Sequence, residues 1–471
     1  MLGPPEAPQE KKTYGLKHGA LSSVETLAQS VSTISPTATP VATIPLVAAL
    51  AGNGTWLAYI LATGGIFLVA LCISKFARYS ASPGSLYSYS ATILTPSLGA
   101  VVAWSLLLAY VAGGSSAIGG VYYYGNSLLH DATGRQLSDI FFGVAVVLIA
   151  GWIAWRDVKI SARLMLWIEA VSLTLILIVV VPVLARHGFH LDWDQLKLKG
   201  MTGSGLRLSL VLALYSFVGF ESATTLGTEA RDPLKSIPRA VILSALLSGA
   251  LFAVLAYAEV LGFRGTGQEL GTSAAPMRVL ARVGGVGYLG AFIDLGAVVS
   301  LFASVLANVT AAARVLLLMS HHGLAHGSLS VTHVRNETPS RSVIVSAIAI
   351  ILPVAALAWR GVSGLDVYAY MGSLGTYGFI VAYGLTCLAL PGYLRNHGAF
   401  HPGAQIIPWL TFAVMLLALV GNLYPVPEGA YGRLPYIFLA YLAAGVLWFF
   451  WSSRRKRLAL ENAAAENTLV D

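Results

Sequence analysis

The sequence predicts an all-α integral membrane protein of about twelve transmembrane helices, and its composition and its long apolar segments are the observations that predict it. Of the 471 residues, 56% are hydrophobic and only 11% are charged. Soluble domains carry about a quarter charged residues, so this chain lacks the polar side chains that a water-exposed surface needs. A spanning helix requires roughly 20 mostly apolar residues, and segments of that length fill nearly the whole chain.

Short polar loops separate the apolar segments, whose boundaries are predicted to within about 2–4 residues. In chain order the expected spans are 24–50, 54–74, 96–124, 139–155, 162–185, 207–230, 238–262, 288–318, 341–359, 365–390, 406–424 and 433–452. The residues before Lys17 contain no apolar run behind a basic start, so no cleavable signal peptide is expected. Residues 1–19 and 454–471 are expected to form cytosolic tails.

The formal net charge of +8 arises from 29 Lys and Arg against 21 Asp and Glu. Most of the basic residues fall in alternate loops and in the two tails, and basic loops resist translocation. This pattern predicts a multi-pass protein of the plasma (inner) membrane with both ends in the cytosol. The basic run 454–457 is interpreted as an anchor at the lipid headgroups, which disfavours a nucleic-acid partner.

No cofactor is indicated. The two cysteines, Cys72 and Cys387, lie in separate apolar spans without a CxxC pattern, so neither a disulfide framework nor a metal site is predicted. The histidines show no HxH or HExxH spacing, and no glycine-rich Lys-Ser/Thr loop is present to hold phosphates. We therefore expect no metal and no ATP-driven pumping.

Two apolar spans are interrupted by residues that break helices. Residues 29–40 (QSVSTISPTATP) contain Pro36 and Pro40, and residues 215–227 (YSFVGFESATTLG) contain Gly219. Proline removes a backbone donor and glycine permits non-helical angles. In hydrocarbon the freed backbone groups need partners, so such breaks persist only inside protein or along a hydrated cavity. The alternative interpretation is that each is a proline kink satisfied by Ser and Thr side chains.

The breaks lie in the first and sixth spans, and matched breaks in two halves are typical of transporters built from inverted repeats. We therefore expect a five-plus-five repeat, with halves at 20–190 and 191–395. Residues 396–453 would then form two accessory helices. The substrate site is expected where the two breaks meet.

Several short motifs occur in an order that resembles one known family, the amino acid–polyamine–organocation permeases, over residues 16 to about 391. They are FVGFE at 217–221, TEARDPLKSIPRA at 228–240, KFARYSASPGSLYSY at 75–89, ARVL at 313–316, HHGL at 321–324 and ETP at 337–339. The resemblance implies a fold of the leucine-transporter type, a substrate site midway across the membrane, and alternating access.

Two positions depart from the family pattern. The first-span Gly-Ser-Gly motif, whose amides bind a substrate carboxylate in the family, is Pro36-Thr-Ala38 here, and Pro36 has no amide hydrogen. The amides of Thr37 and Ala38 remain, and Ser32 and Ser35 are further substrate-binding candidates of this break. Some members carry a proton-coupling lysine in the fifth span, where this chain has Ser172, so a lysine-based mechanism is not expected.

Glu221 is the leading candidate for proton coupling. A carboxylate inside a membrane is costly, usually faces a cavity and is a functional candidate by default. Burial disfavours its charged form, so Glu221 could exchange a proton, bind a substrate amine, or do each in turn. The alternative interpretation is that Glu221 only caps the freed backbone of the sixth span.

The aromatic residues of the same break are candidates for the substrate site. Tyr215 lies six residues before Glu221, where the resemblance to the family's arginine–agmatine antiporter implies an aromatic ring that closes over substrate. A tyrosine ring also offers its face to a cationic amine. Phe217 and Phe220 would form apolar walls beside Gly219. Aromatic residues in membrane helices also face lipid or pack in the core, and this alternative stays open.

In the eighth span, Ser300, Ser304 and Asn308 recur every four residues and so share one helix face. The resemblance implies that Asn308 faces substrate, and that Ser304, with Ser300, lies where sodium-coupled relatives of the fold bind their ion. The alternative is interhelical hydrogen bonding. Weaker lining candidates are Ser115, Ser116, Ser373 and Tyr377. The acidic residues Glu25, Glu169 and Glu259 are interpreted as helix-end, packing or interface charges.

These features predict a secondary active transporter of an amino acid or a related small amine, coupled to protons through Glu221 or working by exchange. Sodium coupling on the same scaffold is the first alternative. A membrane enzyme is disfavoured because no metal or nucleophile–base constellation is present, and a channel is disfavoured by the paired breaks. The other partner expected from the composition is the lipid bilayer.

Overall fold

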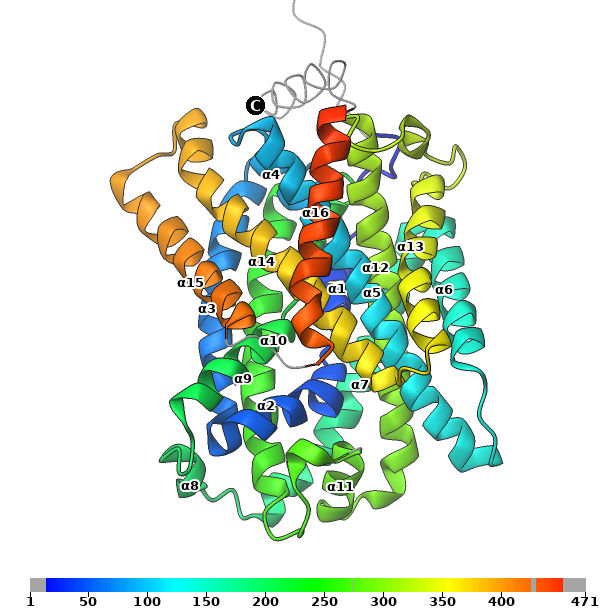
Figure 1. The fold of residues 1–471 in the computed structure, drawn as a ribbon, viewed down its shortest axis with the longest axis vertical. Helices are drawn as coiled ribbons and strands as arrows, with labels where there is room; N and C mark the ends of the chain where they lie inside the picture. The colour runs from blue at the N-terminus through cyan, green and yellow to red at the C-terminus, as the bar shows by residue number, and fades with distance from the viewer. Residues whose placement is uncertain (1–13, 274, 425–428, 452–471) are drawn as a thin grey trace, which may run out of the picture.

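The computed structural model describes residues 14–273, 275–424 and 429–451, and in this part of the chain the regular structure is helical (Figure 1). The one β-type pairing among the described residues is an isolated bridge between Leu21 and Ala230. The predicted basic anchor at 454–457 and most of the two predicted tails lie outside the described residues. The all-α prediction is confirmed.

Helices of the first half follow the predicted spans closely. They are α1 (Ser23–Ile34), α2 (Ile44–Ala51), α3 (Thr55–Ala77), α4 (Ser85–Ala91), α5 (Pro96–Thr133), α6 (Asp139–Arg156) and α7 (Val158–Arg186). The second half and the accessory pair contain α8 (Trp193–Leu196), α9 (Gly203–Tyr215), α10 (Pro233–Gly262), α11 (Pro276–Val283), α12 (Gly290–His321), α13 (Ser340–Trp359), α14 (Gly364–Asn396), α15 (Ile406–Leu423) and α16 (Leu434–Trp451). The short helices α4, α8 and α11 lie in loops and were not predicted.

Ten segments of the described chain are long and apolar enough to cross a membrane. The first of them, Ser23–Ala77, holds two predicted spans that meet at the turn Gly52–Gly54. The sixth predicted span is divided into α9 and a 3₁₀ turn, Ser222–Leu226. Counted in this way, the described residues contain a helical segment at each of the twelve predicted spans, and both predicted breaks are present.

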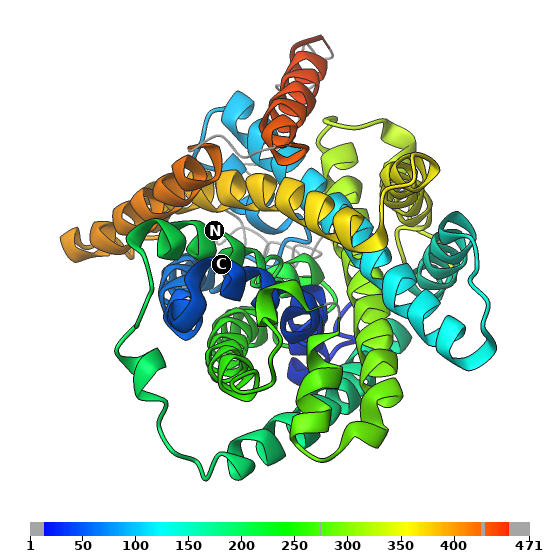
Figure 2. The same ribbon diagram turned by 60° about the horizontal axis from the view of Figure 1, so that its bottom comes forward.

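Burial separates the core helices from the peripheral ones. In α5 and α14, 78% of the most apolar stretch is buried, whereas the corresponding share is 22% in α15 and 28% in α16. The last two helices therefore lie at the edge of the bundle (Figure 1), as do α6 and α13, each with a buried share of 28%. Figure 2 shows α1, in dark blue, surrounded by other helices.

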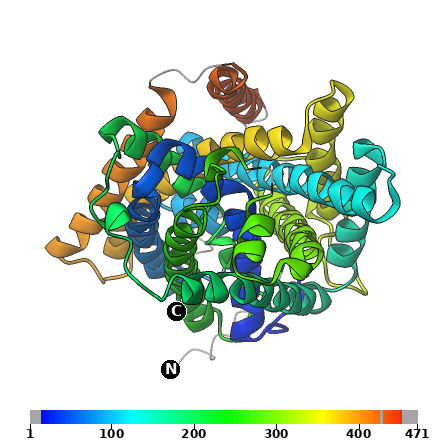
Figure 3. The same cartoon turned by 90° about the horizontal axis from the view of Figure 1, so that it is seen from below.

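The two broken helices are joined at one end by backbone hydrogen bonds. The amide of Leu21, just before α1, donates to the carbonyl of Glu229 at 2.9 Å, and the amide of Arg231 donates to the carbonyl of Leu21 at 2.9 Å. At the opposite end of the bundle, α2, α8 and α11 lie together at the bottom of Figure 1, the end that faces the viewer in Figure 3. The site described next lies between these two ends.

Candidate functional site

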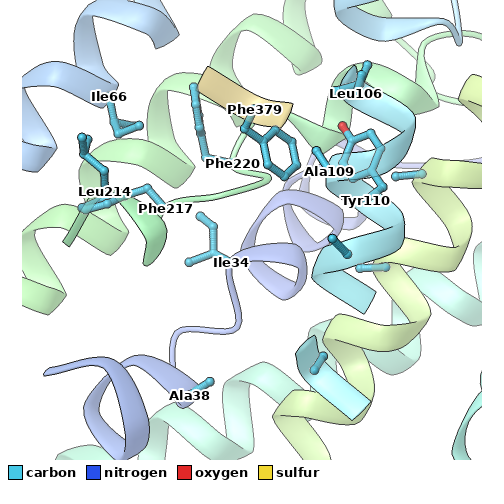
Figure 4. Packing of buried hydrophobic residues seen from close by; sticks show 14 of the residues in the cluster. Ile34, Ala38, Ile66, Leu106, Ala109, Tyr110, Leu214, Phe217, Phe220 and Phe379 are labelled. Atoms are coloured by element: carbon cyan, nitrogen blue, oxygen red, sulfur yellow. The ribbon is translucent and has the colours of Figure 1, made fainter. Parts of the chain in front are cut away.

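The first break follows from two consecutive residues that cannot extend α1. Ser35 has a left-handed backbone with φ of 52°, and Pro36 has no amide hydrogen to donate. The chain then passes through a π-helical turn, Thr39–Thr43, before α2 begins. Figure 4 shows this non-helical stretch between Ile34 and Ala38. The amide of Ser35 still donates to the carbonyl of Val31 at 3.1 Å, so the end of α1 is partly capped.

The second break is a run of tight turns after Tyr215. Successive amides donate to carbonyls three residues earlier, as in Val218 to Tyr215 at 3.1 Å and Ser222 to Gly219 at 3.0 Å. Gly219 has a φ of 86°, which favours glycine. A Cβ at this position would lie 2.2 Å from Cγ2 of Thr33 in α1. The break therefore requires glycine for its angle and for its contact with the other broken helix.

Polar contacts hold the two breaks side by side. The hydroxyl oxygens of Thr33 and Ser222 are 2.7 Å apart, and the Ser222 hydroxyl also donates to the carbonyl of Gln29 at 3.2 Å. The amide of Ala223 donates to the Ser30 hydroxyl at 3.0 Å. Ser and Thr side chains thus satisfy backbone groups freed by the breaks, as the kink interpretation required, but they do so between the two helices.

A small cavity lies where the breaks face α5, α12 and α14, and its free volume is about 30 Å³. Its lining consists of Thr33, Ile34, Ser35, Ala38, Thr39, Gly113, Ser116, Ala117, Tyr215, Ser216, Val218, Leu301, Ser304, Asn308 and Tyr368. None of these described lining residues carries a formal charge. Because a cavity of this size has room only for water-sized molecules, a larger ligand enters only if lining side chains move.

Tyr215 closes one side of the cavity. Its hydroxyl oxygen lies 2.7 Å from the Ser116 hydroxyl oxygen, and its ring packs edge-on against Tyr368 with centroids 5.8 Å apart. The Ser116 hydroxyl is also 2.6 Å from the carbonyl of Tyr368. Gly372 makes room for the tyrosine, since a Cβ there would lie 2.2 Å from its hydroxyl oxygen. Rotation of one side chain, Tyr215, is therefore the simplest way to enlarge the cavity.

Asn308 presents an unused hydrogen-bond acceptor beside the cavity. Its amide nitrogen donates to the Ser304 carbonyl at 2.9 Å, whereas its Oδ1 is buried without a hydrogen-bond partner among the described residues. The Ser304 hydroxyl donates to the carbonyl of Thr33 at 3.3 Å, next to the first break. An acceptor oriented by its own amide group suits a ligand that donates, such as an ammonium or a hydroxyl group.

Glu221 lies beside the cavity rather than in its lining. The Tyr110 hydroxyl of α5 donates to its Oε1 at 2.7 Å, and the Tyr383 hydroxyl of α14 donates to its Oε2. The carboxylate is completely buried. It therefore connects the second break to the two most deeply buried helices, and Phe220 and Phe379 pack in the same region (Figure 4).

A second buried carboxylate, Glu169 of α7, lies on the opposite side of the first break. The hydroxyl of Ser300 donates to both of its oxygens at 3.1 Å, and the hydroxyl oxygens of Ser300 and Ser35 are also 3.1 Å apart. Sequence reasoning assigned Glu169 to packing. The available signal was an acidic residue within an apolar span, the same signal that singled out Glu221.

The predicted site residues divide into two groups. Ser35, Ala38, Tyr215, Ser304, Asn308 and Ser116 line the cavity. Ser32, Thr37, Phe217, Gly219 and Phe220 belong to the breaks but are not among the lining residues. Lining residues that the sequence reasoning missed include Thr33, Thr39, Ser216 and Tyr368.

The weaker candidates lie farther from the cavity. The Ser115 hydroxyl donates to the carbonyls of Val111 and Ile350, so it connects α5 to α13. The Tyr377 hydroxyl donates to the Asn422 carbonyl of α15, and Ser373 is partly buried outside the lining. Among the described residues, no group of three His, Cys, Asp or Glu side chains could hold a metal ion.

Two of the motifs quoted from the sequence meet in space. Arg314 of α12 forms a buried forked ion pair with Glu229, with Nε to Oε2 at 2.5 Å and Nη2 to Oε1 at 2.7 Å. Glu229 also takes part in the backbone pairing with Leu21 before α1. A buried forked pair of this kind constrains geometry strongly, so α12 and both broken helices are fastened together at this end.

This arrangement of two broken helices around a central cavity defines a multi-pass membrane transporter of the leucine-transporter fold type. A solved manganese-transporter variant from Eremococcus coleocola has the same fold, with a TM-score of 0.59 at 12% identity, covering 97% of this chain and 98% of the other. The sequence profile described as amino acid permease matches residues 21–451. The chain belongs to the amino acid permease family, and it is a secondary transporter rather than an enzyme.

Several curated relatives align over most of their length. The branched-chain amino acid permease of Bacillus subtilis is 24% identical, with 87% of each chain covered. The methylthioribose transporter of the same organism is 25% identical over 87% of each chain. The low-affinity putrescine importer of Escherichia coli is 26% identical, covering 66% of this chain and 69% of the importer.

Proposed function

We propose that this protein carries an amino acid or a related small amine across the plasma membrane by alternating access, with both ends of the chain in the cytosol. The observation that supports this most is the small, uncharged cavity at the meeting point of two broken helices. Substrate sites of inverted-repeat transporters lie at such half-helices. Residues 20–190 and 191–395 would be the two repeats, which rock or gate against each other around this cavity.

The lining chemistry supports a small substrate that carries an amine. The relatives named for branched-chain amino acids and for putrescine have an amino group in their ligands, while methylthioribose has hydroxyl groups. The free Oδ1 of Asn308 would accept from such a donor, and the Tyr215 ring would cover it. An uncharged lining disfavours substrates with two carboxylates, because their second charge would be buried without a partner.

Glu221 is proposed as the proton-coupling residue. An ionised carboxylate accepts both tyrosine hydrogen bonds, whereas a protonated one must give up one of them or donate in turn. Protonation would therefore change one of the two tyrosine contacts, by its loss or by its reversal, between the second break and α5 or α14. This change would link proton binding to movement of the sixth span against the core helices.

Sodium coupling remains the second candidate, and Ser304 is the residue that favours it. Its hydroxyl lies 3.3 Å from the Thr33 carbonyl at the end of α1. Hydroxyl and carbonyl oxygens are suitable ligands for a hard cation. Ser300 has its hydroxyl engaged with Glu169 instead.

Uptake by reconstituted vesicles tests the proton hypothesis. Vesicles containing the wild-type protein should accumulate radiolabelled leucine or putrescine when an inward proton gradient is imposed without sodium. Glu221→Gln, which stays neutral, should lower this accumulation to about the level of protein-free vesicles. Glu269→Gln changes an exposed carboxylate and serves as the control.

The outcomes separate the two candidates. Accumulation that a protonophore abolishes supports proton coupling, and accumulation that requires sodium supports the Ser304 alternative. Unchanged uptake with unchanged pH dependence in Glu221→Gln would remove Glu221 from the mechanism.

A further inference from the structure

Glu169 is a buried carboxylate to which the proposed function gives no role. It is 3% exposed, and both of its oxygens accept from a single hydroxyl, that of Ser300. Among the described residues it has no ion pair. A buried carboxylate without a cation is very unfavourable when ionised, so such a group is held neutral or is charged only for part of a cycle.

The charged groups of the neighbouring helices are engaged elsewhere or lie toward helix ends. The titratable side chains of α7 itself and of the packed helices α1, α6, α10, α11 and α12 are Lys159, Arg163, Arg186, Glu25, Asp139, Arg156, Lys235, Arg239, Tyr257, Glu259, Arg278, Arg282, Asp294, Arg314 and His321. Glu25 pairs with Arg163 at 2.9 Å, Asp294 with Arg278, and Arg314 with Glu229. The protonation state of Glu169 therefore acts mainly through Ser300.

Ser300 connects Glu169 to the cavity. Its hydroxyl oxygen is 3.1 Å from that of Ser35, the left-handed residue that ends α1 and lines the cavity. Each hydroxyl has one hydrogen to donate and lone pairs that accept. Whether Ser300 donates to Glu169 or accepts from it therefore determines whether Ser300 accepts from Ser35 or donates to it.

With ionised Glu169, which can only accept, the Ser300 hydrogen points to the carboxylate. Ser35 must then donate its own hydrogen to Ser300 and can present only lone pairs to the cavity. With protonated Glu169, the carboxylic acid can donate to Ser300, Ser300 can donate to Ser35, and the Ser35 hydrogen is released toward the cavity. One proton on Glu169 thus converts Ser35 from an acceptor to a donor while Glu169 stays bonded to Ser300 and Ser300 stays bonded to Ser35.

A hydrogen-bond donor at Ser35 matters because the next residue, Pro36, lacks a backbone donor. Pro36 has no amide hydrogen, so this end of α1 offers one backbone donor fewer to an anionic group than an ordinary residue would provide. A carboxylate is an acceptor only, and facing the lone pairs of Ser35 would be repulsive. An ammonium group, in contrast, is a donor only and suits the acceptor state.

We propose that Glu169 binds a proton that, through Ser300, turns Ser35 into a hydrogen-bond donor for the carboxylate of an amino acid substrate. This inference rests on the proposed function, and it names both the substrate group that couples to the proton and the residues that couple them. Amino acids bind together with the proton. Amines without a carboxylate bind independently of Glu169 protonation or prefer its ionised state.

Equilibrium binding to purified protein in lipid nanodiscs, without any gradient, tests this coupling. The twenty standard amino acids are screened by thermal shift at pH 5.5, and the strongest binder is compared with its decarboxylated amine by titration calorimetry between pH 5.5 and 8. The wild-type affinity for the amino acid should fall by up to about tenfold per pH unit, since binding takes up one proton. The affinity for the amine should not fall with rising pH.

Substitutions of Glu169 and Ser300, which connect the proton to Ser35, have distinct expected results. Glu169→Gln can donate from its amide nitrogen at every pH, so its affinity for the amino acid should be independent of pH and near the wild-type value at low pH. Ser300→Ala should also lose the pH dependence, because without the Ser300 hydroxyl Ser35 is free to donate to the cavity at every pH, and Ser300→Thr should restore the wild-type profile. Ser115→Ala, whose hydroxyl contacts only backbone carbonyls, is the control.

Three results would overturn the inference. They are the absence of any amino acid ligand for the wild-type protein, a full pH dependence retained by Glu169→Gln, and a pH dependence lost in Glu221→Gln or Glu259→Gln but not in Glu169→Gln. Failure of the proposed function looks different, because vesicles would then show no accumulation while proton-linked binding persisted.

Discussion

The two helix breaks solve the same structural problem with different chemistry. The break after α1 has hydroxyl groups and no charge of its own, and Ser300 connects it to a carboxylate of α7, Glu169. The break after α9 contains its own carboxylate, Glu221, and two tyrosines from α5 and α14 hold it. The first break thus contacts a carboxylate from another helix through Ser300, whereas the second break contains its own carboxylate, which contacts the core helices.

This difference indicates separate roles for the two breaks. The first break can adjust the hydrogen-bond polarity of the cavity, because serine hydroxyls reverse direction without moving heavy atoms. The second break can move only if its tyrosine contacts change, because a carboxylate accepts but cannot donate unless it is protonated. Thr33 and Gly219 lie where the breaks touch, and they determine how far one break depends on the other.

The largest effect is expected from Gly219→Ala, which forces the two breaks apart. The new methyl group would lie 2.2 Å from Cγ2 of Thr33, on a backbone with φ of 86°. Backbone strain and overpacking each cost about 1–3 kcal/mol, so the purified variant should lose several degrees in melting temperature and much of its ligand binding.

Gly361→Ala is the control for that substitution. Gly361 has a φ of 75° but no heavy atom within 4 Å of its added Cβ, so this variant measures the backbone cost alone, about 1 kcal/mol. Equal melting temperatures for the two variants would mean that the contact with Thr33 does not hold the breaks together.

The fold was largely predictable because a membrane span is recorded in the length and hydrophobicity of a segment. The errors occur where a helix extends beyond its apolar stretch or continues through a proline. The third span was predicted to end at 124, but α5 continues to Thr133 through polar residues outside the apolar stretch. The seventh span was predicted to begin at 238, whereas α10 begins at Pro233 and contains Pro238 within the helix.

The site was predictable only in part, because its residues come from helices that are distant in the chain. Breaks, prolines and acidic residues can be seen along the sequence, and these signals made Ser35 and Glu221 candidates, whereas the family resemblance pointed to Tyr215. Tyr368 was missed because its ring meets Tyr215 only after α9 and α14 pack. Glu169 was assigned to packing because nothing in the sequence indicates that Ser300 faces it.

A smaller effect is expected from Gly372→Ala, which acts on the second break through Tyr215 alone. The added Cβ would lie 2.2 Å from the Tyr215 hydroxyl oxygen, so the ring must move away from Ser116. Because the obstructing atoms are the far end of a side chain that can rotate, the fold should survive. Uptake should show a raised KM, by about tenfold if the ring contributes about 1.4 kcal/mol to binding, with a melting temperature near the wild-type value.

Gly384→Ala provides the comparison for Gly372→Ala in the same helix. Its added Cβ would lie 3.6 Å from the nearest atom, which is an ordinary contact. If both variants show the same KM, displacement of Tyr215 has no effect on substrate binding, and the ring is a packing residue.

The smallest effect is expected from Thr33→Val, which removes one hydrogen bond between the breaks and keeps the shape of the side chain. Ser222 retains the carbonyl of Gln29 as a partner at 3.2 Å, so the loss should be about 1 kcal/mol of stability. Thr174→Val in α7, whose hydroxyl bonds only to Ala170 of its own helix, is the matched control. If Thr33→Val lowers the melting temperature no more than Thr174→Val but changes the pH dependence of amino acid binding, the hydroxyl bridge transmits a signal between the breaks. If it lowers the melting temperature without changing that dependence, the breaks are joined for stability and respond to protons independently.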